Sequence, residues 1–171
     1  MKQVEILSQA AWGICTPQEL RNFMRLDDGE TDETLLHYIT AASSLFEEMT
    51  YYTLQKKHYQ VTYENMDRVK FHIAHRPLRT ILSVTRGERI LQPDAYLVKD
   101  QKIYLDDYSD YSLSVEYEAG FETVDDVPAS LKHIIMMCAA DLYLYRLSDA
   151  GHYGFTDRIL DIIALYTEKS L

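Results

Sequence analysis

The sequence predicts an α+β fold: a helical bundle of about four helices with an antiparallel β insertion between the second and third helices. Apolar residues recur at helical spacing in the first and last thirds of the chain but alternate with polar residues in the middle third. The stretch 131–147 is apolar nearly all round, which is typical of a helix buried on most sides. At 171 residues the chain fits a single domain, 1–171, packed around that helix.

Two N-terminal helices are expected within 16–50, after a lead-in at 1–15 that has little pattern. Thr16 suits an N-cap and Pro17 the first helical position. Glu19 is placed to complete a capping box with Thr16. An acidic loop then separates this short helix from a longer amphipathic one.

The segment 57–120 is predicted to be the β insertion. Its short stretches of alternating residues are separated by turn residues, which indicates antiparallel strands. Residues 96–98 and 103–105, joined by a polar turn, are interpreted as a hairpin. The other predicted strands are 59–63, 69–73, 81–86 and 113–119.

The remaining helices are expected in a central stretch, 127–147, and in a C-terminal segment, 152–171. Thr156 is suited to cap the last helix. Asp141 and Arg146 interrupt the central helix, which is also too short to span a bilayer, so no membrane association is expected.

The net charge of −10 argues against a protein that grips nucleic acid through its phosphates. The two cysteines, Cys15 and Cys138, lie far apart and are interpreted as reduced thiols of a protein made in the cytosol. The N-terminus has no long apolar stretch, so no signal peptide is expected.

No catalytic motif is present, so we expect no enzyme, no cofactor and no metal. His72 and His75 have a spacing that places their rings on opposite faces of a strand. The acidic run 27–33 has its glycine in the wrong place for a calcium loop, and the carboxylates at 106–110 are interpreted as a loop between strands. A metal site at 106–110 remains a minor alternative.

A second class of function stays open beside a non-enzymatic one. The chain would then be a small soluble ligand-binding or enzymatic domain with a pocket between the sheet and the central helix. Only His133 and Asp141 offer side-chain chemistry on that helix, which disfavours this alternative. The fourteen tyrosines favour a protein with large contact surfaces, although most of them are expected to pack on sheet faces.

Three stretches of the chain resemble one known family in their order and spacing. The first joins Met24-Arg25-Leu26-Asp27-Asp28 to a helix containing Leu35-Leu36 and Ile39-Thr40-Ala41-Ala42. The second joins Arg76-Pro77-Leu78 and Ile81-Leu82-Ser83-Val84 to Pro93-Asp94-Ala95-Tyr96-Leu97-Val98. The third joins Val115-Glu116-Tyr117-Glu118-Ala119-Gly120-Phe121 to Val127-Pro128, Leu131-Lys132 and Tyr143-Leu144-Tyr145-Arg146. The likeness spans about 16–147 and is to the head–tail connector (adaptor, or head-completion) proteins of long-tailed bacteriophages, long members with a β insertion.

The resemblance implies a structural virion protein in the neck, between head and tail. Such a protein forms a ring, expected to be dodecameric, beneath the portal protein. It extends the DNA channel without sequence-specific binding and joins the capsid to a stopper or tail-completion protein.

The resemblance also suggests which residues meet these partners. Portal binding is expected from the C-terminal part, at Tyr153, Phe155, Ile159, Ile163 and Tyr166. The alternative is that the last helix only closes the bundle. The candidate acids that would line the channel are Asp27, Asp28, Glu30, Asp106, Asp107 and Asp110.

Overall fold

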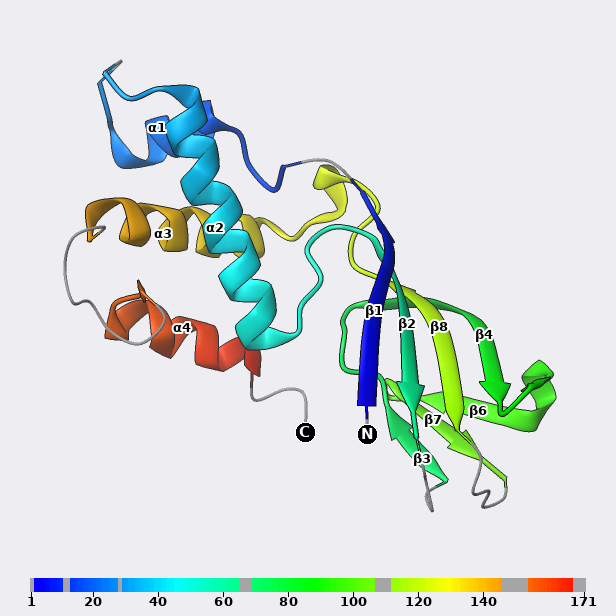
Figure 1. The fold of residues 1–171 in the computed structure, drawn as a ribbon. Helices are drawn as coiled ribbons and strands as arrows, with labels where there is room; N and C mark the ends of the chain where they lie inside the picture. The colour runs from blue at the N-terminus through cyan, green and yellow to red at the C-terminus, as the bar shows by residue number, and fades with distance from the viewer. Residues whose placement is uncertain are drawn as a thin grey trace. The chain divides into compact units, whose positions relative to one another are not determined.

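The computed structural model describes residues 2–10, 13–27, 29–64, 69–106, 112–145 and 154–167. Its contacts divide the chain into two compact units. The β unit comprises Met1–Ala10 and Gln55–Gly120, and the helical unit comprises Ala11–Leu54 and Phe121–Leu171. Four α-helices and antiparallel strands confirm the predicted α+β class (Figure 1).

The helical unit contains α1 (Pro17–Met24), α2 (Asp32–Thr50), α3 (Ala129–Leu144) and α4 (Asp157–Thr167), with a short 3-10 turn, η2 (Val124–Asp126), before α3. Thr16 and Glu19 form the predicted capping box, because each side chain accepts a hydrogen bond from the other residue's backbone N–H. Pro128 is the N-cap residue of α3.

One apolar core holds the helical unit together. α3 buries residues on several sides, including Leu131, Ile135 and Cys138, as its apolar composition predicts. The rest of this core is Ile14, Cys15, Leu20, Leu35, Ile39, Ala42, Phe46, Leu54, Val127, Ile134, Ala139, Phe155, Ile159 and Ile163.

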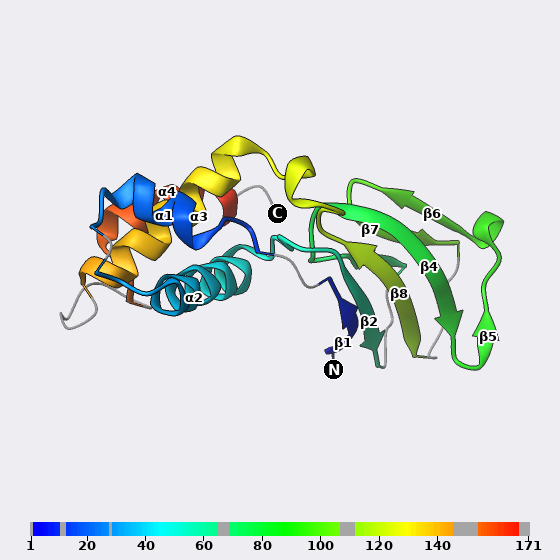
Figure 2. The ribbon, with the colours of Figure 1, turned by 90° about the horizontal axis from the view of Figure 1, so that it is seen from above.

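The β unit contains two antiparallel sheets. The five-stranded sheet has the order β1-β2-β8-β4-β5, and the three-stranded sheet has the order β3-β7-β6. The strands are β1 (Lys2–Gln9), β2 (Lys57–Tyr63), β3 (Lys70–His72), β4 (Leu78–Arg86), β5 (Arg89–Ile90), β6 (Tyr96–Lys99), β7 (Lys102–Leu105) and β8 (Leu113–Ala119), and a 3-10 turn, η1 (Pro93–Ala95), precedes β6. Figure 1 shows β1, β2, β8 and β4 side by side, and Figure 2 shows β6 running apart from this row.

The two sheets share one core. Val61 of β2, Val115 and Tyr117 of β8, Phe71 of β3 and Ile103 of β7 belong to a single buried cluster. The predicted hairpin is formed by β6 and β7, whose turn has positive φ angles at Asp100 and Gln101.

The N-terminal strand differs from the sequence prediction. Residues 1–15 are interpreted above as a lead-in, but β1 pairs with β2 from Lys2 opposite Tyr63 to Gln9 opposite Lys57. The sheet is therefore completed by a strand that precedes α1. The pattern is weak because every side chain described in β1 is exposed and a bulge at Leu7 interrupts the alternation.

Candidate assembly surfaces

A buried arginine fixes the acidic loop between α1 and α2. The Arg21 guanidinium is 8% exposed and donates to the backbone carbonyl of Glu30 at 2.9 Å and to Oδ1 of Asp32 at 2.7 Å. These contacts join α1 to the start of α2 across the loop. Glu30 and Asp32 are therefore held against α1.

Two of the candidate channel acids in this loop have different surroundings. The Asp27 side chain is exposed. The half-buried Glu30 carboxylate accepts a hydrogen bond from the Tyr143 hydroxyl of α3. Asp28 lies outside the described residues. Asp27 is consequently the described acid of the loop that is most available to solvent.

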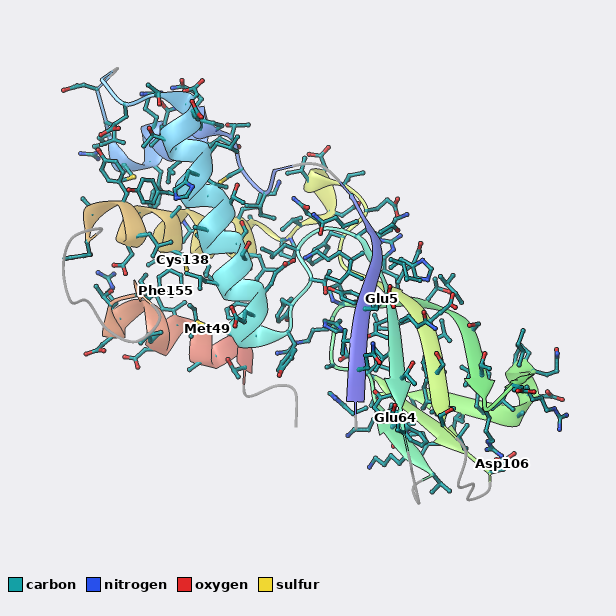
Figure 3. The ribbon with its side chains drawn as sticks, in the orientation of Figure 1. Glu5, Met49, Glu64, Asp106, Cys138 and Phe155 are labelled. Atoms are coloured by element: carbon teal, nitrogen blue, oxygen red, sulfur yellow. The ribbon has the colours of Figure 1, made fainter. Side chains whose placement is uncertain are left out.

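The other candidate acids belong to the β unit. Asp106 follows the end of β7 and is exposed, as Figure 3 shows. Asp107 and Asp110 lie outside the described residues. The structure thus places Asp27 and Asp106 in different compact units.

The charge of the chain is divided unevenly between the units. The helical unit contains six Lys and Arg residues against sixteen Asp and Glu residues, whereas the β unit contains eleven of each. The whole formal charge of −10 therefore belongs to the helical unit.

Most of the predicted portal-binding patch is inside the helical core. Phe155, Ile159 and Ile163 have exposed fractions of 0%, 5% and 1%. The half-buried Tyr166 ring lies 5.8 Å from the ring of Phe46, and Tyr153 lies outside the described residues. The three buried side chains close the bundle, as in the alternative stated above, because α4 packs its apolar face on α2 and α3. Figure 3 shows Phe155 within the helical unit.

The surface that α4 does expose consists of other residues. Leu165 is 64% exposed. A shallow groove runs between α4 and the end of α2, with Met49 and Tyr51 on one side and Leu160 and Ala164 on the other. Sequence reasoning missed Leu165 because the helical pattern alone does not tell which side of α4 faces the core.

The edge strand β1 also exposes apolar side chains. Val4 and Ile6 have exposed fractions of 45% and 52%, although they pair with the buried residues Val61 and Tyr59. The side of the sheet that forms the core therefore continues onto β1, where the second sheet leaves it uncovered. Sequence reasoning did not find this surface because it assigned no strand there.

His133 and Asp141, the two side chains of the central helix that could offer chemistry, make contacts within the helical unit. His133 is exposed and lies edge-on to Phe23. Asp141 is buried and accepts two hydrogen bonds from Thr156. Burial raises the pKa of the Cys15 and Cys138 thiols to about 12, which keeps them protonated and unreactive.

Within the described ranges, no three His, Cys, Asp or Glu side chains are grouped as a metal ion requires. No helix in the described part of the chain is long and apolar enough to cross a membrane.

Comparisons with known proteins give a family and a fold. A family model described as "Head completion protein" matches residues 13–141. A chain from "Neck of empty GTA particle computed with C6 symmetry" is similar with a TM-score of 0.73 and 19% identity, over 96% of this chain and 94% of that one.

Two further solved structures give the same coverage. A chain from "Virion of native gene transfer agent (GTA) particle" has a TM-score of 0.72 and 17% identity, over 96% and 94% of the two chains. A chain from "Neck of native GTA particle computed with C12 symmetry" has a TM-score of 0.69 and 18% identity, again over 96% and 94%. No curated protein sequence matches the chain.

Proposed function

Since the chain belongs to the head completion protein family, we propose that it forms a ring in the neck of a phage-like particle, beneath the portal protein. The ring would extend the DNA channel and join the capsid to a stopper or tail-completion protein. A head completion protein is a structural part of the particle and not an enzyme.

One observation carries this proposal. The fold matches a chain of a neck solved with C6 symmetry over 96% of this chain's length. Both compact units, and not one of them alone, therefore follow the fold of a protein from a symmetric neck. A ring of identical copies needs two different side faces on each copy, which agrees with apolar surface exposed on both units.

The portal contact is proposed for the C-terminal segment, 152–171, which contains α4. Phe155, Ile159 and Ile163 would hold α4 on the bundle from within, because they are buried. The exposed side chain of Leu165 and the adjoining groove would contact the portal. Tyr153 and Tyr166 stay part of the proposed contact at the two ends of the segment.

The channel lining is proposed for the acidic residues. Asp27 is exposed on the unit that carries the whole negative charge, and Asp106 is exposed on the β unit. Carboxylates repel the phosphates of DNA, so a lumen lined by them lets the duplex slide without gripping it. Asp28, Glu30, Asp107 and Asp110 remain members of this proposed set.

Co-expression with the portal protein of the same genome tests the function. Light scattering and negative-stain imaging would then measure the mass and shape of any complex. We expect a second ring stacked coaxially on the portal. A chain that stays monomeric at every concentration and does not associate with the portal would contradict the proposal and would favour a ligand-binding domain.

A further inference from the structure

Both long edges of the five-stranded sheet have unpaired stretches. β1 forms one edge over its eight residues. At the other edge, β5 pairs only with Thr85 and Arg86 of β4, so the outer side of residues 78–83 has no partner strand among the described residues. An unpaired edge presents backbone N–H and C=O groups that can pair with another strand.

The two edges run in opposite directions. β1 is antiparallel to β2, β2 to β8, and β8 to β4. β1 and β4 therefore point in opposite directions along the sheet, at the positions that Figure 1 shows. A second copy rotated about an axis along the strands would bring its β4 beside β1 as an antiparallel neighbour, which continues the pattern within each copy.

The side chains at the two edges complement each other. On the core side, Val4 and Ile6 of β1 are about half exposed, and Leu78 and Ile81 of β4 are only partly buried. Joining the edges would cover these side chains and make one continuous apolar core. Leu82, at a bulge of β4, adds a further exposed apolar side chain.

The partner that fits both edges at once is another copy of this chain, because β1 and β4 run in opposite directions and both leave apolar side chains uncovered on the core side of the sheet.

We propose that β1 of one copy pairs with the outer edge of β4 of the next copy, so that the sheets of neighbouring subunits join around the ring. The inference rests on the proposed ring and names the interface within it. Because the two edges differ, the contact is heterologous and can repeat until the ring closes.

Cross-linking of introduced cysteines tests the pairing in the full-length chain. The native thiols of Cys15 and Cys138 are buried and do not interfere. In rings assembled on the portal, the double variant Glu5→Cys/Thr80→Cys treated with a short bismaleimide should give a ladder of multimers. The matched control Glu5→Cys/Leu97→Cys places the second thiol on β6 of the other sheet and should give no ladder.

Several outcomes are decisive. Rings that form without a ladder would overturn the β1–β4 pairing and leave the proposed function intact. A covalent dimer from Glu5→Cys alone would show β1–β1 pairing and would also overturn it. Failure of the unmodified chain to form any ring on the portal would contradict the proposed function and this interface together.

Introducing a charge into β1 gives a second test of the interface, with the yield of assembled rings as the measurement. Ile6→Lys places a solvated ammonium group on the face that the neighbour should cover, so ring yield should fall about tenfold or more. Leu97→Lys is the control, because Leu97 is 61% exposed on the other sheet. Equal ring yields for two folded variants, checked by circular dichroism, would count against the inference.

Discussion

Asp141 in α3 binds Thr156, the residue just before α4. Its Oδ2 accepts the backbone N–H of Thr156 at 2.7 Å, and its Oδ1 accepts the Thr156 hydroxyl at 2.9 Å. The Thr156 carbonyl in turn accepts the N–H groups of Ile159 and Leu160 in the first turn of α4. The one carboxylate of α3 therefore fixes where the last helix starts.

Replacing this carboxylate should destabilise the helical unit. In Asp141→Ala, two donors of Thr156 lose a charged acceptor at a buried site, so the free energy of unfolding should fall by about 2–3 kcal/mol. Urea unfolding followed by circular dichroism measures the change. The control Asp161→Ala removes an exposed carboxylate from α4 and should change stability by less than about 0.5 kcal/mol. Equal effects of the two variants would contradict this role.

Arg21 should stabilise the contact between α1 and the start of α2. Arg21→Gln removes the hydrogen bonds to Glu30 and Asp32 and leaves the partly buried Glu30 carbonyl without this donor, which should cost about 1–2 kcal/mol. Hydrogen exchange should also become faster around Asp27. Arg158→Gln on the exposed side of α4 is the charge-matched control. Unchanged exchange in the loop would show that something else holds it.

Alkaline pH should destabilise the protein through four buried acids. Burial raises the pKa of Cys15, Cys138 and Tyr63 to about 12, and also raises the pKa of Tyr117. The unfolded chain releases these protons at lower pH than the folded chain does. The stabilisation is therefore complete below the ordinary thiol pKa of 9.0 and is lost as the pH rises toward about 12.

Measuring the free energy of unfolding between about pH 8 and pH 11 checks this. Each group should lower it by about 1.4 kcal/mol per pH unit once the pH exceeds the pKa that the group has in the unfolded chain. The double variant Cys15→Ala/Cys138→Ala keeps both tyrosines and should show a shallower slope. Stability that does not change above about pH 9 would rule out the buried thiols as the cause.

Portal binding should depend on Leu165. Leu165→Asp places a charge on the proposed apolar contact and should weaken binding to the portal about tenfold or more. Leu144→Asp is the matched control, because the side chains are almost equally exposed: Leu144 in α3 is 65% exposed and Leu165 in α4 is 64% exposed. Binding measured by sedimentation or light scattering should fall only for the α4 variant. An equal loss for both would remove the basis for placing the contact on α4.

DNA passage should depend on the acids of the channel. Asp27→Lys/Asp106→Lys gives the lumen groups that attract phosphates, so DNA should leave assembled particles more slowly, and more so at low salt. Asp94→Lys, in η1, is the control for an exposed acid outside the proposed lining. A ring structure with all six candidate acids on its outer surface would overturn this part of the proposal.

Local signals in the sequence predicted most elements but not their partners. Thr16 and Glu19 define a helix start through contacts within four residues, so the start of α1 could be predicted. The hairpin of β6 and β7 is equally local. The division of the strands into two sheets depends on pairs such as Val61 with Val115, which lie far apart in the chain. Such pairs leave no local signal.

The candidate surfaces were harder to predict for the same reason. The apolar spacing of Phe155, Ile159 and Ile163 correctly indicates one face of a helix, but either the core or a partner could cover that face. The structure shows that the core covers it. Val4 and Ile6 were missed for a different reason, since no strand was predicted there. β1 is an exposed edge strand with a bulge, so apolar and polar residues alternate too little along it for the strand to be recognised.

The crossing of the chain between the two units has a consequence for its synthesis. β1 leaves the ribosome before α1 and α2, whereas its partner β2 follows them and β8 follows later still. The helical unit likewise draws its core from both sides of the β unit's sequence. The sheet cannot be completed until β8 is made, because β8 lies between β2 and β4. A chain that ends before β8 could therefore not present β1 and β4 as the two edges of one sheet, which would keep such incomplete subunits out of the proposed assembly.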